Sequence, residues 1–172
     1  GDHRDLHRLI RRQRQMCIRD RAIIGLLTSI LLPTFHKVRH KSYQVHCISN
    51  LRQIGQALEM YVYDNDMYLP VCAWRPGDNP DNLPYLHQVL SSYLCEVQGV
   101  FHCPADRFYY YEEGTSYEWY QLINGYRYDT QPDFEKAPYF SRSDIPILYD
   151  IDNFHFGGKN ILYPDCRVEG ID

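Results

Sequence analysis

Apolar residues near the start of the chain form an uninterrupted run that ends at a proline. Residues 22–32 (AIIGLLTSILL) carry no charge and are followed by Pro33. Eleven helical residues span about 16 Å, roughly half of the hydrocarbon core of a bilayer. Alone, such a run is typical of a buried helix or a signal-peptide core. Its large members, with the proline that closes it, are Ile23, Ile24, Leu26, Leu27, Ile30, Leu31, Leu32 and Pro33.

Beyond the proline, apolar residues recur at spacings of three, four and seven. They are Phe35, Val38, Val45, Ile48, Leu51, Ile54, Leu58 and Tyr61. This spacing places them on one face of an amphipathic helix, and a helix can continue past proline with a kink. We predict one continuous helix over residues 22–62, within a segment 22–63 whose first part lies in a membrane or filament core. The following Asp-Asn-Asp predicts its end, with Asn65 in a left-handed cap.

After residue 64 the pattern becomes one of short elements separated by turn residues. Residues 75–84 are rich in Pro, Gly, Asp and Asn, and 85–94 have the spacing of a short helix. Short β-prone runs follow at 100–101, 108–111, 117–120, 125–128, 145–149 and 161–163. The prediction is an α+β fold in which one long N-terminal helix packs on a small antiparallel β-sheet head with long loops, residues 64–172.

Charge divides the chain into a basic start and an acidic body. Residues 1–21 hold seven Arg and three Asp, which is +4, and the whole chain carries −4, so the other 151 residues carry −8. The acidic body gives no support to nucleic-acid binding. Within the basic start, RRQRQMCIRDR resembles translated adapter sequence, and we interpret residues 1–21 as a non-native Arg-rich flank. The alternative is a genuine cytoplasmic flank that follows the positive-inside rule.

Several motifs occur in an order that resembles the bacterial pseudopilins of the type IV pilin and type II secretion class. The apolar run ends in Leu-Leu-Pro, and Cys47, NLRQIG (50–55) and YLP (68–70) follow. VFHCPAD (100–106) and HFGGKNILYPDCRVE (155–169) match later elements, the second being similar to an H-x9-D-G signature. The signature residues are His155, Gly157, Gly158, Asp165 and Cys166, with Cys166 where the family has glycine. The family's Gly-Phe-Thr-Leu-Ile-Glu site, where a peptidase cleaves and then methylates the new N-terminus, is absent from the sequence.

The resemblance implies a structural protein and not an enzyme. It implies a single-pass inner-membrane subunit of a type II secretion or type IV pilus-like filament, with its head in the periplasm or outside the cell. Its partners would be other pilin-like subunits, in a homo- or hetero-filament, and the inner membrane. The alternative is an extracytoplasmic domain, tethered by the N-terminal helix, that binds a glycan or protein through exposed Tyr residues and Trp74 or Trp119.

We interpret the closing signature as a β-hairpin without a catalytic role. Asp165 and Cys166 separate two β-prone runs, and Asp-Gly is preferred in two-residue turns because both central residues take positive φ. No Gly-x-Ser-x-Gly motif supplies a nucleophile for a His155–Asp165 pair. We therefore expect His155 and Asp165 to organise the hairpin, and no catalytic residues.

Cysteine and carboxylate side chains suggest other kinds of site. Six Cys occur without a CxxC, so spacing does not fix any pairing. Cys47 and Cys103 could form a disulfide that joins helix and head, or could bind zinc together with His46 and His102. Asp144, Asp150, Asp152 and Asn153 form a cluster of oxygen donors near which Asp165 could lie, and calcium takes six to eight oxygens. Some type II secretion pseudopilins bind calcium in a C-terminal loop, so the resemblance implies a calcium site at Asp150, Asp152 and Asp165. The alternative is a solvated acidic loop. No other cofactor is expected.

Overall fold

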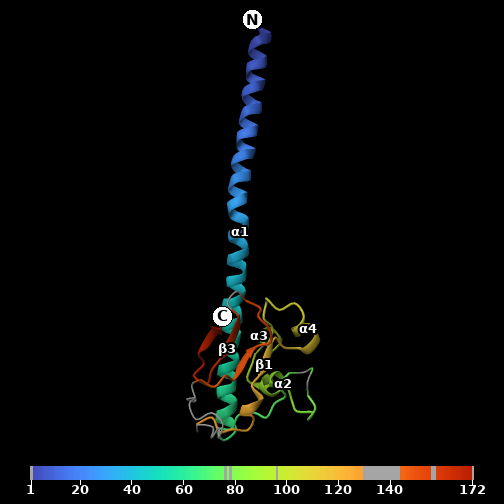
Figure 1. Cartoon of the computed structure of the whole chain (residues 1–172), viewed down its shortest axis with the longest axis vertical. Helices are drawn as coiled ribbons and strands as arrows, with labels where there is room; N and C mark the ends of the chain where they lie inside the picture. Colours follow the sequence, from blue (N-terminus) through green and yellow to red (C-terminus); the bar gives the residue numbers. More distant parts are fainter. Residues whose placement is uncertain are drawn as a thin grey trace. The chain divides into compact units, whose positions relative to one another are not determined.

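The computed structural model describes residues 2–75, 77, 79–95, 97–129, 144–155 and 158–171, with the backbone alone described for 2–20, 97, 98 and 171. The chain divides into two compact units, Gly1–Arg39 and His40–Asp172. Helix α1, Asp2–Asp64, contributes to both units (Figure 1). The predicted continuous helix over 22–62 is therefore confirmed, and it begins upstream of the expected start.

The end of α1 lies where the sequence predicted it, but its cap is different. The Asn65 side-chain amide donates to the Tyr61 carbonyl at 2.7 Å, and the Met67 N–H donates to the Val62 carbonyl at 2.9 Å. The left-handed residues are Asp66 and Met67 (φ 52° and 65°), so Asn65 caps the helix through its side chain. These bonds satisfy carbonyls that have no partner within the helix.

The face of α1 that packs in the head begins at Cys47. Leu51, Ile54 and Leu58 are buried as predicted, and Ile48 and Tyr61 are partly buried. The expected head-packing role of the first three stripe residues is wrong, because Phe35, Val38 and Val45 are 67%, 60% and 58% exposed. Periodicity identifies a helix face, but the extent of its burial depends on where the head begins.

The head contains one four-stranded antiparallel sheet in the order β1-β2-β3-β4. Its strands are β1 (Tyr117–Trp119), β2 (Leu148–Asp150), β3 (Lys159–Leu162) and β4 (Val168–Ile171). Figure 1 shows these strands beside the C-terminal part of α1. The contact is close at Gly55, where an added Cβ would lie 3.3 Å from a methyl group of Leu162 on β3. The predicted α+β class is confirmed, and the arrangement is consistent with a pilin-like fold.

Short helices fill the segments between α1 and the sheet. They are α2 (Leu86–Val89), η1 (Leu90–Ser92), α3 (Val97–Val100), α4 (Tyr109–Glu113) and η2 (Gln121–Ile123). Three predicted β runs are wrong: 108–111 lie largely in α4, 125–128 contribute only the isolated bridge of Arg127 to Tyr68, and Val100 ends α3. Aromatic and β-branched residues favour strands, but helix capping and packing override that preference here.

The turn between β3 and β4 differs from the predicted two-residue turn. The Cys166 N–H donates to the Tyr163 carbonyl, and the Tyr163 N–H donates to the Arg167 carbonyl, which closes a loop of residues 164–166. Among the described residues of this loop, Cys166 alone has positive φ, at 57°. A turn followed by one left-handed residue is a common three-residue hairpin loop with a glycine preference at that last position. Backbone geometry thus accounts for a glycine there, without any reactive role.

Replacing Cys166 by glycine should stabilise the head. A non-glycine residue in the left-handed region is disfavoured by about 1 kcal/mol, so Cys166→Gly should raise the free energy of unfolding by up to about that amount. Cys95→Gly is the matched control, because Cys95 is exposed and has no positive φ. That change should lower stability through backbone entropy. Chemical unfolding of the full chain measures both, and equal losses for the two variants would contradict the assignment of strain.

Candidate functional site

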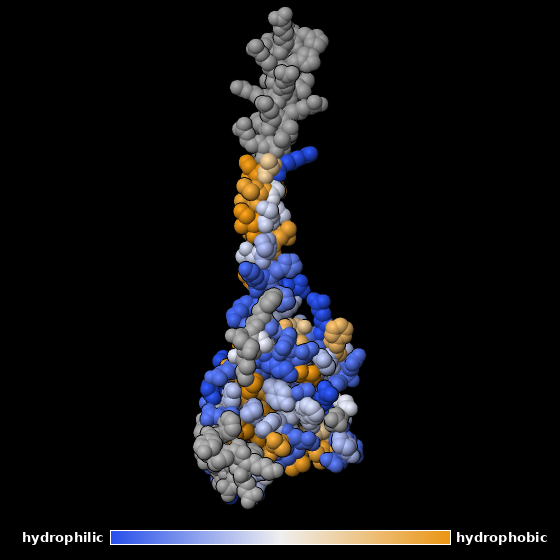
Figure 2. All heavy atoms as spheres, viewed as in Figure 1, coloured by the Kyte–Doolittle hydropathy of each residue, from blue (hydrophilic) through white to orange (hydrophobic). Residues whose placement is uncertain are grey.

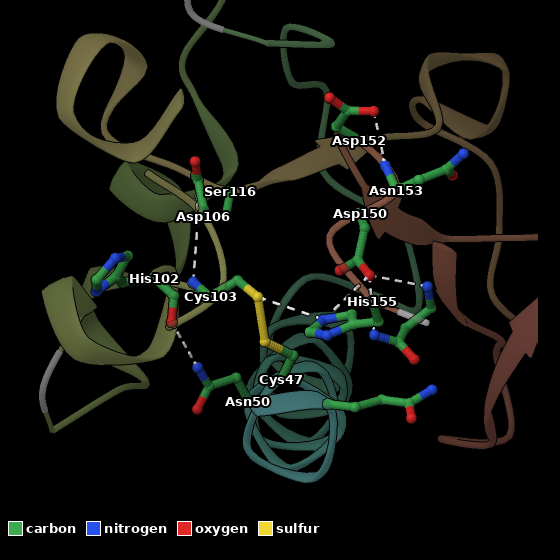
Figure 3. Close-up of polar contacts among 12 residues, drawn as sticks. Cys47, Asn50, His102, Cys103, Asp106, Ser116, Asp150, Asp152, Asn153 and His155 are labelled. Atoms are coloured by element: carbon green, nitrogen blue, oxygen red, sulfur yellow. Dashed lines mark hydrogen bonds and ion pairs between the residues drawn. A yellow bond between two sulfur atoms is a disulfide. The ribbon is translucent and has the colours of Figure 1, made fainter. Parts of the chain in front are cut away.

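A disulfide joins α1 to the segment that follows α3. Cys47 and Cys103 are bonded, their Cα atoms lie 5.3 Å apart, and neither side chain is exposed. One turn further along α1, the Asn50 amide donates to the His102 carbonyl at 2.9 Å (Figure 3). The bond closes a loop with a sequence separation of 56, for which chain entropy predicts about 4 kcal/mol of stabilisation.

His155 lies against this disulfide and beside a buried carboxylate. Its Nε2 atom is 3.4 Å from Cys103 Sγ and 3.8 Å from Asp150 Oδ2, as Figure 3 shows. His155 forms an isolated bridge with Gly158 just before β3, and Asp150 ends β2. Their side chains are 1% and 0% exposed. The sheet and the N-terminal helix therefore meet at a buried group of sulfur, imidazole and carboxylate.

The Asp150 carboxylate is held by the neighbouring strand. Oδ2 accepts hydrogen bonds from the backbone N–H and the side-chain amide of Asn160, both at 2.8 Å. Oδ1 has no hydrogen-bond partner in the part of the chain that the structure describes. Burial raises the pKa of Asp150 to about 7, although the Asn160 bonds act in the opposite direction. A buried acid with a raised pKa takes up a proton readily near neutrality.

His155 is shifted in the opposite sense. Burial lowers its pKa to about 4, and the nearby His40 and Lys41 charges act in the same direction. At neutral pH the imidazole is therefore uncharged, and its contact with Asp150 is not an ion pair. The two pKa values move in opposite directions for a shared reason, the removal of water from both groups.

A second buried carboxylate organises the loop that carries Cys103. Asp106 accepts hydrogen bonds from the backbone N–H groups of Phe108, Tyr109 and Tyr110 at 2.9–3.0 Å. It also accepts a 2.6 Å bond from Ser116 Oγ, which in turn accepts from the Cys103 N–H. Asp106 thereby caps α4 and fixes the backbone of the disulfide cysteine. The VFHCPAD motif is thus a structural unit, and this role of Asp106 was not foreseen from the sequence.

The cluster contains one group of side chains suited to a transition metal. The ligand atoms of Cys47, Cys103 and His155 lie within 4.8 Å of one another, and this is the only such group of three or more found among the described residues. These sulfur and nitrogen donors could hold a metal ion, but they are not a calcium site. Of the two alternatives for these cysteines, the disulfide is confirmed, and the zinc set with His46 and His102 does not form, because His46 is exposed and the two cysteines are bonded to each other.

The predicted calcium site at Asp150, Asp152 and Asp165 is wrong in its geometry. Asp150 is buried and bonded to Asn160, whereas Asp152 is exposed and accepts a bond from the Asn153 N–H. The Asp165 side chain is 49% exposed at the β3–β4 turn, where it accepts from the Arg167 N–H. Each carboxylate thus has its own partner, and calcium requires six to eight converging oxygens.

The two ends of the closing signature, His155 and the pair Asp165–Cys166, lie in different parts of the head. His155 lies against the disulfide, whereas Asp165 and Cys166 lie in the β3–β4 turn. In that turn Asp165 is exposed and Cys166 is partly buried near Gly55. His155 bridges to Gly158 directly before β3, and Asp165 accepts from the Arg167 N–H in the turn, so the two residues act at opposite ends of β3. That they organise the closing hairpin stays a prediction. Gly158 has the positive φ of 83° that favours glycine, and Gly157 lies outside the described residues.

Comparison of the chain with models of known protein families, with curated proteins and with solved structures finds no match.

Single variants of Asp150 and His155 should separate the contributions of the two pKa shifts to the pH dependence of stability. Between pH 3.8 and 7 the unfolded chain loses the Asp150 proton that the folded chain keeps, so raising the pH destabilises the fold. Between pH 6.5 and 4 the unfolded chain takes up a His155 proton that the folded chain excludes, so lowering the pH destabilises it. In the unmodified chain these two contributions oppose each other between pH 4 and 6.5.

Asp150→Asn should leave the histidine contribution alone, so the free energy of unfolding should fall as the pH is lowered from 6.5 to 4. His155→Gln should leave the aspartate contribution, so stability should fall as the pH is raised from 4 to 7. Each slope is at most about 1.4 kcal/mol per pH unit. Chemical unfolding across this pH range measures both, and slopes of the same sign would contradict the assigned shifts.

Proposed function

We propose that the chain is a membrane-anchored, pilin-like structural subunit of a type II secretion or type IV pilus-like filament. Its apolar helix segment inserts into the membrane and packs with helices of other subunits, and its head carries the outward-facing surface. The observation that carries the proposal is the exposed apolar run of residues 22–32. By length and composition, α1 between Arg21 and Asp64 is a helix that could cross a membrane.

The apolar side chains of this run are exposed, so they are stable only if something other than water covers them. Its seven large aliphatic side chains are each between 50% and 64% exposed, and Figure 2 shows apolar side chains gathered along this part of α1. Covering each is worth about 1 kcal/mol or more, so leaving them in water is unfavourable by roughly 10 kcal/mol. Lipid chains, or the same segment of neighbouring subunits, would supply that cover.

The polar residues within the run, and Thr34 directly after it, are compatible with lipid. Thr28 and Ser29 donate their hydroxyl hydrogens to the carbonyls of Ile24 and Leu26, both at 2.7 Å, and Thr34 donates to the Ile30 carbonyl at 3.1 Å. Hydroxyl groups satisfied within the helix avoid the free-energy penalty of an unpaired donor in hydrocarbon.

Small residues on the run would let helices approach closely. Gly25 and Ser29 are four apart and therefore share a helix face, and a Cβ added at Gly25 would meet nothing within 4 Å. Small residues at this spacing favour close helix–helix packing in membranes. The face supports association of subunits over a solitary anchor.

The disulfide supports a location for the head. Disulfides persist in oxidising compartments such as the periplasm or the cell exterior. A buried Cys47–Cys103 bond in the head therefore favours a single-pass inner-membrane anchor with the head on the periplasmic or extracellular side.

A charge within the apolar run should prevent membrane insertion. Leu27→Asp places a carboxylate in the run, where insertion of aspartate is unfavourable by about 3 kcal/mol. Val45→Asp is the matched control, because Val45 is similarly exposed (58% against 54%) but lies outside the run. Vesicle flotation of the full chain should show loss of the membrane-bound fraction for Leu27→Asp only. Equal flotation of both variants would show that the run is not the anchor.

A bulky residue on the Gly25–Ser29 face should weaken the association of subunits without affecting membrane insertion. Gly25→Leu keeps the run apolar, so the variant should float with vesicles as the unmodified chain does, yet it should self-associate at least about tenfold more weakly. Leu26→Ala, which changes a neighbouring position without adding bulk, serves as the control. Sedimentation equilibrium in density-matched detergent measures the association. An unmodified chain that inserts but stays monomeric would instead favour the tethered binding domain.

A further inference from the structure

The two disulfide cysteines and two neighbouring side chains, all buried, carry metal-binding atoms. Cys47 and Cys103 contribute sulfur, and His155 contributes Nε2 at 3.4 Å from Cys103 Sγ. Asp150 adds a carboxylate oxygen at 3.8 Å from the same nitrogen. These residues come from α1, the segment after α3, the bridge before β3 and the end of β2, as Figure 3 shows. Three of these donors, from Cys47, Cys103 and His155, lie within 4.8 Å of one another, and Asp150 lies beside His155 but outside that group. The cluster therefore supplies the kinds of donor that a tetrahedral metal site requires, with Asp150 as the ligand that must move toward the sulfur atoms.

The distances fit the edges of such a site. With Zn–S near 2.3 Å and Zn–N or Zn–O near 2.0 Å, a regular tetrahedron has S···N edges of about 3.5 Å and N···O edges of about 3.3 Å. The observed Sγ···Nε2 and Nε2···Oδ2 distances are 3.4 Å and 3.8 Å. Little movement of His155 would be needed to form the edge to Cys103. Asp150 would have to approach the sulfur atoms, because it lies outside the group of donors within 4.8 Å of one another.

The carboxylate also has coordinating capacity to spare. Oδ2 of Asp150, the oxygen 3.8 Å from His155 Nε2, receives both Asn160 hydrogen bonds, whereas Oδ1 has no hydrogen-bond partner within the described ranges. Rotation of the carboxylate would present Oδ1 to a metal ion while Oδ2 keeps the Asn160 bonds. Asp150 is fully buried, so an oxygen without a partner is unfavourable unless a proton or a cation satisfies it. Hydrogen bonds to a ligating carboxylate are a common feature of metal sites, because they orient the ligand.

We propose that reduction of the Cys47–Cys103 disulfide converts this cluster into a zinc site with Cys47, Cys103, His155 and Asp150 as its four ligands. A dithiol reductant supplies two electrons and two protons, which break the S–S bond and give two thiols, and the reductant becomes a disulfide. Zn²⁺ then displaces the two thiol protons and binds two thiolate sulfurs, one imidazole nitrogen and one carboxylate oxygen. The sulfur atoms move apart to about 3.8 Å, the S···S edge of a zinc tetrahedron.

The two states are mutually exclusive and join the same elements. In an oxidising compartment the disulfide connects α1 to the segment after α3, and in a reducing compartment zinc makes that connection and adds β2 and the β3 bridge. The head can thus keep its attachment to α1 on either side of a membrane. This inference does not depend on the proposed filament role.

The test uses the full chain in detergent with Co²⁺ as a spectroscopic probe for the zinc site. A background variant with Cys17→Ser, Cys72→Ala, Cys95→Ser and Cys166→Gly retains only the Cys47–Cys103 pair. After reduction by a phosphine, it should bind one equivalent of Co²⁺, with a sulfur-to-cobalt charge-transfer band and the visible bands of a tetrahedral ion. Zn²⁺ should displace the cobalt, and reoxidation should release it. Absence of the charge-transfer band in the reduced chain would overturn the proposal.

Single variants in this background test each ligand. Cys47→Ser should abolish the charge-transfer band of a two-thiolate site, and His155→Ala and Asp150→Asn should each weaken binding at least about tenfold. Asp152→Asn, an exposed carboxylate two residues from Asp150, should leave the affinity unchanged. Equal affinity of the Asp150 and Asp152 variants would exclude Asp150 as a ligand and overturn the four-ligand site.

A reduced chain that unfolds still gives a decisive result. In that case Zn²⁺ should restore the helical circular dichroism of the background variant, because metal binding and folding are coupled at such sites. It should not restore that of the Cys47→Ser variant. Failure of Zn²⁺ to refold the reduced background chain would contradict the proposal.

Discussion

The structure of the head depends on one attachment, the burial of α1 from Cys47 to Val62 together with the disulfide that begins this stretch. Cys47, Leu51, Ile54, Leu58 and Val62 are at most 1% exposed, and Cys47 is bonded to Cys103. This burial fixes which face of the helix the head occupies. At the same level of the head, the disulfide sulfur meets His155, and His155 meets Asp150. The same attachment of α1 therefore brings together the hydrophobic packing, the disulfide and the buried polar cluster.

Only the C-terminal part of α1 is buried in the head, so the apolar run of residues 22–32 needs a different environment. The core cluster of the head takes its α1 residues from Cys47 onward, and the aliphatic side chains of residues 22–32 remain exposed. A helix with a buried amphipathic part and an exposed apolar part needs two environments, a protein core and a non-aqueous surrounding. That division is the physical basis of the proposed anchor and subunit contact.

The sequence predicted the elements whose signals are local. The long helix and the position of its end followed from periodicity and from a cluster of polar turn residues, and β1, β2 and β3 fall within or beside predicted runs. Helix α4 was missed because its stability depends on Asp106, whose carboxylate caps it. An aspartate just before an aromatic run is the available signal, since aspartate is a preferred cap.

The candidate site could not be derived in the same way, because its contacts are distant in sequence. Cys47 and Cys103 are 56 residues apart, and spacing alone left a disulfide and a zinc site as alternatives. Asp150 is paired with Asn160 across neighbouring strands, so its burial follows from the sheet and not from the surrounding acidic residues, which had suggested calcium. The turn at Cys166 was located correctly, but its conformation depends on the loop length that β3–β4 register imposes.

The central claim, that α1 passes from a lipid environment into the core of the head, is tested most directly by spin-label accessibility along the helix in vesicles. Single labels would replace residues 23–32 and 48–62 in turn, in a chain that keeps the Cys47–Cys103 disulfide and lacks the free cysteines. The account predicts oxygen accessibility typical of lipid along the first stretch, apart from the Gly25–Ser29 face that packs against other subunits. In the second it predicts immobile labels with a period of 3.6 residues, at Leu51, Ile54 and Leu58. Aqueous accessibility throughout residues 23–32 would contradict it.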